Sequence, residues 1–498
     1  MYPKKAIIIG SGVAGMASAI RLAVQGFAVT VYEKNNYAGG KLSAFEKQGY
    51  HFDAGPSLFT QPQNIEELFT LADEPIENYL SYHKIDIACK YFFENGKEIH
   101  AYSNKDLFAN EIQKKTGEPK ENIINYLGRS EKLFNNVANI FLNYSLHKKS
   151  TWLHPRSIKA FSSLKFPYIF KSLNEYNKSF KTTETQQIFN RFATYNGSNP
   201  YKAPAMLSLI PHLEQTEGAY YPQGGMISIT NALYKLALKK GVKFRFDVEV
   251  QKIICPDNVA IGIVVNNENI MADVVVSNSD VYFTYKNLLS NNIKAKKVLK
   301  QERSSSALAF YWGINTFYSQ LELHNIFFSK DYSAEFDHIF KRKKLYSDPT
   351  VYINITSKIE KAQAPNGCQN WFVMINMPAT NTYDVEIVKN NAREYIIAKL
   401  NRILKTDVAS HIVTETFLHP QSIEINTGSY LGSLYGTSSN SKAAAFLRHP
   451  NFTKGIKNLY CCGGSVHPGG GIPLCLKSAK IVSDLVKHDS KNDRKIHV

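Results

Sequence analysis

The sequence predicts an α/β fold (α+β overall) in which a second domain interrupts a discontinuous Rossmann-like domain. Two observations indicate it. A glycine-rich turn follows an apolar strand at the start of the chain, and another lies between a predicted strand and helix at 463–471. The strands and helices predicted at the two ends of the chain must therefore belong to one domain, with their strands in a single sheet. A chain of 498 residues is also too long for one simple core, which predicts two or three domains.

The first turn has the G-x-G-x-x-G spacing of a dinucleotide-binding βαβ unit. Gly10, Gly12 and Gly15 follow the apolar run 6–9, and a second strand ends at Glu33. In such a unit, one glycine makes the tight turn, one lets the backbone contact a pyrophosphate, and one packs helix against strand. The pyrophosphate lies at the helix N-terminus, where free N–H groups favour anions. Glu33 would bind ribose hydroxyls and repel a 2′-phosphate, which argues against NADP.

The N-terminal apolar run is not expected to be a signal peptide or an anchor. Lys4 and Lys5 precede it, but the three glycines and Arg21 interrupt it, and no small-residue cleavage site follows. The sequence contains no window of about eighteen uninterrupted apolar residues, so no helix is predicted to span a bilayer.

The cysteines predict neither a disulfide framework nor a zinc site. The chain has six, without a C-x-x-C pair, so no metal site is predicted and a reducing cytoplasm is expected. Cys461 and Cys462 lie in an apolar strand and are expected to be core residues.

The formal net charge of +17 calls for an anionic partner, either nucleic acid or a membrane surface. No nucleic-acid motif is present, so no nucleic-acid partner is expected. The segment 148–181 mixes basic and aromatic residues, which is typical of an element in the membrane interface. A solvated helical face over an ordinary core is the alternative. The residues concerned are Lys148, Lys149, Arg156, Lys159, Lys165, Lys171, Lys178, Lys181, Trp152, Phe161, Phe166, Tyr168, Phe170 and Phe180.

The pattern along the chain predicts three regions. Helices are expected over 105–185 and near 386–404, and strands over 242–276 and at intervals in 300–380. The last strand and helix return at 458–487 to complete the first sheet. The predicted dinucleotide-binding domain is 1–75, 222–290 and 455–490; the substrate domain is 76–104, 185–221 and 291–454; a helical, membrane-facing lid is 105–184.

The second glycine-rich turn, CCGGSVHPGGGIPLCLKSAK, predicts close approach of the backbone to a ligand. Pro473 suits the first helical position, where its missing N–H costs nothing. The positive end of that helix would face an anion. In a flavoprotein this would be the N1/C2 edge of the isoalloxazine, with a stabilisation of the reduced ring of up to about 1–2 kcal/mol.

Taken together, these motifs resemble the FAD-dependent carotenoid desaturases of bacteria, the phytoene-desaturase-type members of the flavin amine oxidase superfamily. The resemblance covers nearly the whole chain. It rests on GSGVAGMASAIRLAVQGFAVTVYEKN with GGK, GYHFDAGPSLF, RFATYNGSNPYKAPA, EGAYYPQGGM, ADVVVSNSD, SSSALAFYWGIN, HNIFFSKDY and NLYCCGGSVHPGGGIP. The hydroxycarotenoid 3,4-desaturase branch is the most similar. Lys41 departs from the arginine of many relatives, and Leu474 from a usual glycine.

The resemblance implies FAD as cofactor and assigns residues to it. Pyrophosphate contacts fall at the fingerprint glycines, ribose contact at Glu33, adenine contact at the backbone of Val250, and ring contacts at 55–58 and 471–473. The implied cofactor residues are Gly10, Gly12, Gly15, Glu33, Lys34, Gly40, Lys41, Gly55, Pro56, Ser57, Leu58, Val250, Gly464, Ser465, Gly471, Ile472 and Pro473.

The resemblance also implies a carotenoid substrate, drawn from the inner face of the cell membrane, and oxygen or a quinone as final electron acceptor. An apolar tunnel would bind such a chain at roughly 25 cal/mol per Å² buried. Predicted wall residues are Phe59, Phe192, Tyr195, Tyr220, Tyr221, Phe310, Tyr311 and Trp312. Candidate catalytic residues are Glu214, Glu217, Arg191 and His467. A phytoene desaturase, a redox-neutral carotenoid isomerase, a flavin amine oxidase and a flavin-free prenyl-binding relative are the alternatives.

Overall fold

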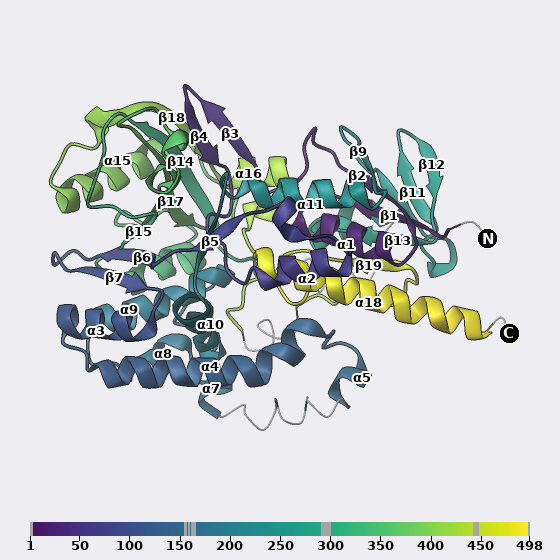
Figure 1. The fold of residues 1–498 in the computed structure, drawn as a ribbon, viewed down its shortest axis with the longest axis horizontal. Coiled ribbons are helices and arrows are strands. Elements are labelled where there is room, and N and C mark those ends of the chain that lie inside the picture. The colour runs from purple at the N-terminus through teal and green to yellow at the C-terminus, as the bar shows by residue number, and fades with distance from the viewer. Residues whose placement is uncertain are drawn as a thin grey trace.

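The computed structural model describes residues 3–153, 157, 160, 166–289, 300–441 and 448–496. Figure 1 shows three regions: a parallel sheet with its helices on the right, a larger mixed sheet at the upper left, and a group of helices along the lower edge. Of the basic and aromatic segment 148–181, Arg156, Lys159, Phe161 and Lys165 lie outside the described residues.

The first sheet has five parallel strands in the order β19-β13-β1-β2-β9. The strands come from three separate parts of the chain, as the two glycine-rich turns predict. Their apolar, β-branched runs suit a parallel sheet that is covered on both faces. Their bounds are β1 Lys5–Ile9, β2 Ala28–Tyr32, β9 Lys243–Arg245, β13 Val274–Ser277 and β19 Leu459–Cys461.

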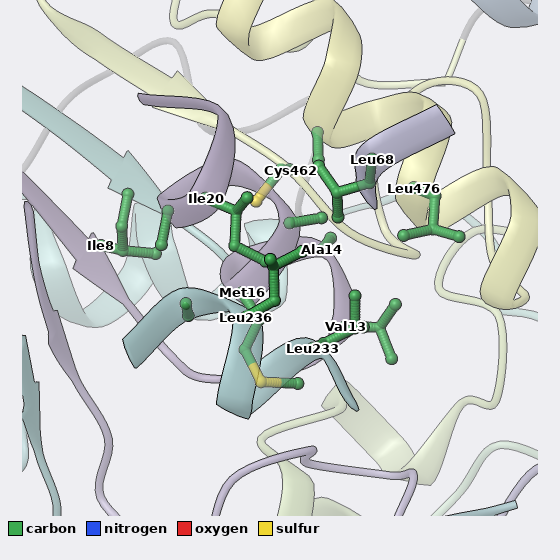
Figure 2. Close-up of a cluster of buried hydrophobic side chains, with 14 of the residues drawn as sticks. Ile8, Val13, Ala14, Met16, Ile20, Leu68, Leu233, Leu236, Cys462 and Leu476 are labelled. Atoms are coloured by element: carbon green, nitrogen blue, oxygen red, sulfur yellow. The ribbon is translucent and has the colours of Figure 1, made fainter. Parts of the chain in front are cut away.

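Four helices cover one face of this sheet: α1 (Val13–Val24), α2 (Gln63–Leu71), α11 (Ile227–Lys239) and α18 (Ile472–Ile496). Figure 2 shows side chains of all four meeting around Ala14 and Ile20 of α1. Cys462 packs in the same cluster and Cys461 in the core of the opposite face, and each is 1% exposed. The prediction that both are core residues is confirmed.

The opposite face is covered by a three-stranded meander, β10 (Lys252–Ile254), β11 (Gly262–Val265) and β12 (Glu268–Met271). The first strand predicted within 242–276, over 242–254, is broken here. Asp247 has a φ of 56°, so the chain turns out of the sheet between β9 and β10. The amide of Val248 donates to the carbonyl of Glu33, which holds this detour beside the end of β2.

The second sheet has seven strands in the order β18-β14-β17-β16-β15-β6-β7, antiparallel except for the pair β15–β6. Its bounds are β6 Ile87–Phe92, β7 Glu98–Tyr102, β14 Ser306–Ile314, β15 His324–Phe327, β16 Val351–Asn354, β17 Gln369–Met377 and β18 Ile412–Leu418. The predicted helix near 386–404 is confirmed as α15 (Val385–Leu404), which covers one face. Alternate residues of β14, among them Phe310 and Trp312, pack beneath it.

The remaining elements link these layers. Hairpin β3 (Ala44–Lys47) and β4 (Tyr50–Asp53) packs on the face of the second sheet opposite α15, and β5 (Tyr82–Lys84) pairs with β8 (Tyr220–Pro222). The short helices are α10 Ile210–His212, α12 Val281–Phe283, α14 Tyr332–Asp337 and α16 Pro420–Thr427.

The range 105–184 is helical wherever it is described, apart from short connections. Its helices are α3 Lys105–Thr116, α4 Lys120–Asn143, α5 Lys149–Trp152, α7 Phe166–Phe170, α8 Leu173–Asn177 and α9 Thr183–Asn190. Helix α4 runs beneath α18, so this region borders the first domain as well as the second sheet (Figure 1). Within the described helices, none has the length and apolar character needed to cross a bilayer.

Candidate active site

A cavity of about 970 Å³ opens where the strands of the first sheet end and continues beneath the second sheet. Four residues that line the cavity come just after strands of this sheet: Gly10 after β1, Glu33 after β2, Asn278 after β13 and Gly463 two residues after β19. Carboxyl ends of parallel strands meet at one edge of a sheet, which is the usual place for a ligand in such folds. The two glycine-rich turns, from opposite ends of the chain, thus lie on one cavity.

The N-terminus of α1 is open toward this cavity. Gly12 caps the helix without a side-chain hydrogen bond, and the first turn holds no acidic residue. Its free N–H groups therefore suit an anion. Gly15 does not line the cavity: a Cβ on it would lie 2.1 Å from the Gly10 carbonyl oxygen. Gly15 is thus the glycine that lets helix and strand pack closely.

Glu33 is held at the cavity wall by two main-chain amides and one hydroxyl. Its Oε2 accepts from the amide of Ser11 at 2.7 Å and from the Ser11 hydroxyl at 2.9 Å, and its Oε1 accepts from the amide of Asn35 at 3.0 Å. The side chain is buried and lines the cavity, as do Lys34 and Val250. A fixed carboxylate beside the fingerprint fits a ribose diol.

The segment that carries Gly40 and Lys41 lies beside the start of α1, where Gly39 pairs with Gly12. Lys41 Nζ donates to the carbonyls of Ser433 at 3.1 Å and Leu434 at 2.8 Å. Burial lowers the pKa of this ammonium to about 8. The following loop, Gly55 to Leu58, packs directly on this segment, since a Cβ on Gly55 would lie 1.7 Å from the Lys41 carbonyl oxygen. Gly40, Lys41 and 55–58 all line the cavity.

The tail turn contributes Gly464, Ser465, Gly471, Ile472 and Pro473 to the lining. Helix α18 begins at Ile472, so Pro473 occupies its second position, one later than predicted. Proline suits this position equally, because the first four N–H groups of a helix have no intrahelical acceptor. The first turn of α18 contains no acidic residue, so its positive end also faces the cavity uncompensated.

Leu474, the departure from the family's glycine, is not among the described residues that line the cavity. Its Cδ1 lies 3.4 Å from the position of a Cβ on Gly469, so the side chain fills space within the turn instead. The larger residue therefore leaves the ligand side of the turn open. With one helix terminus for the pyrophosphate, another for the ring and a carboxylate for the ribose, the residues present fit FAD.

The second sheet supplies the other end of the cavity. Ala307, Ala309 and Tyr311 of β14 face it, together with Phe372 and Met374 of β17. Of the predicted wall residues, Tyr195 and Tyr311 line the cavity. The other six (Phe59, Phe192, Tyr220, Tyr221, Phe310 and Trp312) lie in hydrophobic cores beside it.

Arg191 and Glu214 form a buried ion pair on the cavity wall. Arg191 Nη2 lies 2.8 Å from Glu214 Oε1 and 2.9 Å from Oε2, and it also donates to the Tyr91 hydroxyl at 2.8 Å. The hydroxyl of Tyr195 donates to the same carboxylate. The neighbouring Glu214 charge outweighs burial and raises the pKa of Arg191 further, and burial together with Glu214 raises that of Tyr195. The Arg191 guanidinium therefore stays charged within an aromatic wall.

The other two candidate catalytic residues are not brought to the cavity. His467 Nε2 lies 3.0 Å from the Tyr144 carbonyl oxygen, and burial lowers the pKa of this imidazole to about 4. Glu217 Oε1 lies 3.7 Å from His212 Nε2. Neither is among the described residues that line the cavity.

Several cavity residues were not predicted. Asn278 follows β13 at the same sheet edge as the fingerprint, and the rule on carboxyl ends of parallel strands was sufficient to find it. Phe372 and Met374 alternate along β17. His324 begins HNIFFSKDY, one of the stretches that carry the family resemblance, but nothing local to it or to Tyr352 indicates that both face the cavity, because two adjacent strands bring them together only in the folded sheet.

Comparison with known proteins agrees with this architecture. The family model "Flavin containing amine oxidoreductase" matches residues 13–487. The 1-hydroxycarotenoid 3,4-desaturase of Flavobacterium sp. (strain P99-3) is 50% identical over 483 residues, covering 97% of this chain and 99% of the relative. The 4,4'-diapolycopene oxygenase of Methylomonas sp. is 33% identical over 491 residues, 98% of each chain.

Among solved structures, an oxidoreductase from Methanosarcina mazei matches 97% of this chain and 100% of its own, with a TM-score of 0.63 at 16% identity. That likeness supports the fold alone. The family match and the two relatives go further, because they extend over almost the whole chain. The chain belongs to the flavin-containing amine oxidoreductase family, on the branch that holds these carotenoid-modifying relatives.

Proposed function

We propose that this protein is an FAD-dependent desaturase that introduces a C=C bond into an acyclic or monocyclic carotenoid, by 3,4-desaturation of a hydroxycarotenoid. The observation that carries the proposal is one continuous cavity. It joins the two glycine-rich turns to a wall of small and aromatic residues on the second sheet. The 50% identity to a 1-hydroxycarotenoid 3,4-desaturase supports the choice of substrate.

The residues assigned to FAD follow the two turns. We place the pyrophosphate at Gly10 and Gly12, the ribose at Glu33, and the ring between 55–58 and the start of α18 at Ile472. When bound, the flavin supplies a two-electron acceptor for the hydride that leaves one carbon of the substrate. The division into domains proposed from the sequence follows the same logic, with the first sheet holding the cofactor and the second the substrate.

The protein itself must exclude water and accept the proton from the adjacent carbon. Glu214 is the candidate base that reaches the cavity, and we propose it as the proton acceptor. Arg191 holds this carboxylate in place through two contacts from one nitrogen, and Tyr195 adds a third donor. The apolar side chains around them bind the hydrocarbon and keep water from the carbon that loses hydride.

We further propose that the enzyme takes its substrate from the inner face of the cell membrane. Exposed apolar side chains lie at two places on the lower group of helices (Figure 1), directly after α5 and on α7: Leu153 is 83% exposed, Phe166 68% and Phe170 52%. Lys148, Lys149 and Lys171 flank them in sequence. Such a surface suits a bilayer interface rich in anionic lipid. Oxygen or a quinone would reoxidise the flavin.

The test is to purify the protein with FAD and incubate it with a hydroxycarotenoid in liposomes. We expect flavin absorbance, a product that has lost two hydrogens, and a red-shifted polyene spectrum. Protein that cannot be reconstituted with FAD would contradict the proposal. An unchanged product mass would identify a carotenoid isomerase, and peroxide formed from amines would identify an amine oxidase.

A second candidate follows from the relatives. Because a 4,4'-diapolycopene oxygenase is 33% identical over 98% of the chain, oxygen insertion is the main competing reaction. Product mass separates the two: a desaturase removes two hydrogens, and an oxygenase adds oxygen. Phytoene, a carotenoid with only a short conjugated segment, offered in the same assay, tests the phytoene desaturase alternative. A flavin-free lipid carrier would bind the polyene without changing it.

A further inference from the structure

A second polar group lies on the cavity wall, on the strands opposite the cofactor turns. His324 of β15 and Tyr352 of β16 both line the cavity. His324 Nδ1 lies 2.8 Å from the Tyr352 hydroxyl and 3.1 Å from Asn354 Nδ2. The Tyr352 hydroxyl in turn lies 2.7 Å from Ser57 Oγ. A hydrogen-bonded chain therefore runs from the loop 55–58 to the imidazole.

The hydrogen bonds of His324 fix where its proton lies. Asn354 Nδ2 can only donate, and it also donates to the Leu323 carbonyl at 3.1 Å, which sets the orientation of the amide. Nδ1 of His324 must therefore be an acceptor. Burial, with the nearby Arg191 charge, lowers the pKa of His324 to about 3, so the ring is neutral at pH 7. The single ring proton is then on Nε2.

This Nε2–H has no hydrogen-bond partner within the described part of the chain, although His324 is only 3% exposed. Nε of Arg191, on the same cavity wall, is also buried without a partner among those residues. Buried polar groups are almost always paired, because an unpaired one loses its bond to water without replacement. Two unpaired donors on one cavity call for a ligand atom with lone pairs.

A carotenoid hydrocarbon cannot provide such an atom, whereas a hydroxylated end group can. The donor must also lie close to the reacting bond, since the hydroxyl in a 1-hydroxycarotenoid is only a few bonds from carbons 3 and 4. The position of His324 satisfies this condition, because one tyrosine hydroxyl links it to Ser57 on the loop assigned to the ring face of the cofactor. Arg191 and Glu214 border the same region.

We propose that His324 Nε2–H binds the oxygen of a hydroxyl group at the end of the carotenoid that is desaturated, and that it thereby selects oxygenated substrates. This inference rests on the proposed function. It assigns His324 as a substrate-binding residue that sets the position of the polyene along the cavity: when its oxygen is bound, the nearby carbons 3 and 4 lie at the reacting position. An analogue without the hydroxyl leaves the donor unpaired, so it is discriminated against.

The experiment compares a hydroxycarotenoid with its deoxy analogue in the FAD-loaded protein. We expect wild type to prefer the hydroxylated polyene by about 10- to 100-fold in kcat/KM. His324→Phe keeps the ring shape and removes the donor, so this preference should vanish through slower turnover of the hydroxylated substrate. His324→Gln keeps an N–H near the Nε2 position and should retain most of the preference. Equilibrium binding to protein whose flavin has first been reduced, measured without oxygen so that no turnover occurs, should follow the same order.

The outcomes separate the two levels of inference. If wild type converts both polyenes equally, or His324→Phe slows both by the same factor, the subsite is overturned while the desaturase proposal stands. If flavin-loaded wild type converts neither, both are overturned. Flavin content and thermal midpoint are recorded for each variant. Should His324→Phe fail to fold, the preference of wild type and of His324→Gln decides the matter.

Discussion

The carbonyl oxygen of Gly10 lies where a side chain on Gly15 would begin: a Cβ on Gly15 would be 2.1 Å from it. This closeness brings α1 down onto β1 and opens the helix N-terminus toward the cavity. We expect Gly15→Ala to displace the helix and to abolish FAD retention, which flavin absorbance of the purified protein measures.

Gly128→Ala is the matched control, because Gly128 lies inside α4 with nothing within 4 Å of its Cβ position. In a helix interior, this change should stabilise the protein by about 0.5–1 kcal/mol and leave flavin content unchanged. Full flavin occupancy in Gly15→Ala would show that the packing of α1 on β1 is not needed for the cofactor.

The Arg191–Glu214 pair should be sensitive to removal of one partner. Glu214→Gln leaves a buried guanidinium without its counter-charge, so we expect a loss of about 3–5 kcal/mol in the free energy of unfolding, together with loss of turnover. Urea unfolding of the flavin-loaded protein measures the loss in the free energy of unfolding. Glu386→Gln, at an exposed pair with Lys389, should cost less than about 1 kcal/mol.

The double variant Arg191→Met, Glu214→Leu tests the cause. Removing both charges avoids the unpaired ion, so the double variant should be more stable than Glu214→Gln although it remains inactive. A double variant that is less stable than Glu214→Gln would mean that the pair stabilises the fold by more than mutual neutralisation of its charges.

Acid should destabilise the protein through buried histidines. Burial lowers the pKa of His449 to about 4 from an ordinary value of 6.5. Between these values the unfolded chain binds a proton that the folded protein does not, so stability is lost as the pH falls from 6.5 towards 4. The folded ring is neutral: Nδ1 can donate to the Pro450 carbonyl at 2.7 Å, and Nε2 can accept from Tyr285 at 2.9 Å.

We therefore expect His449→Gln to be less stable than wild type at pH 7.5 but to lose less on going to pH 5. The difference between the two losses should be on the order of 2 kcal/mol. Urea midpoints at the two pH values measure it. Carboxylates contribute equally to both proteins, so parallel pH dependences would contradict the assignment.

Membrane attachment should depend on the exposed apolar side chains beside α5 and on α7. We expect Leu153→Asp with Phe166→Asp to reduce binding to anionic liposomes several-fold, because both remove apolar surface and add charge of the wrong sign. Co-sedimentation measures binding. Raising the salt concentration should weaken binding of wild type, since the flanking lysines act through screened charges.

Ile387→Asp with Val413→Asp provides the control for this prediction. These side chains are 59% and 50% exposed, and they belong to α15 and to the edge strand β18, which Figure 1 shows at the upper left, away from α5 and α7. Liposome binding that responds equally to both pairs of changes would show that general surface charge, and no particular face, mediates attachment.

The half of the cavity assigned to the cofactor could be predicted because its signals are local. Gly10, Gly12 and Glu33 are fixed by a turn, a helix start and a strand end within one βαβ unit. The tail turn before Ile472 is similar: strand, glycines and helix follow one another in the chain. Each residue's role depends on its own backbone, so spacing in the sequence is enough to place it against a ligand.

The substrate half was less predictable, because strand alternation leaves two faces and the sequence does not say which one is buried against what. Both faces of β14 are buried, so no polar residue marks the difference: Tyr311 faces the cavity, and Phe310 and Trp312 face α15. Ala307 and Ala309, on the same face as Tyr311, leave room for a ligand, but although they lie in a stretch that carries the family resemblance, no local pattern indicates which face they occupy. Only the position of α15 decides the matter.

The sequence by itself therefore determined the nucleotide-binding framework, its interruption by a second domain and the class of cofactor. The tertiary structure alone decided which aromatic residues face the ligand, that Arg191 meets Glu214, and that His324 reaches the cavity with an unpaired donor. The physical reason is the distance along the chain over which the deciding contacts act. Turns and caps are set by neighbours in the chain, whereas these side chains are brought together by strands and helices that lie far apart along the chain.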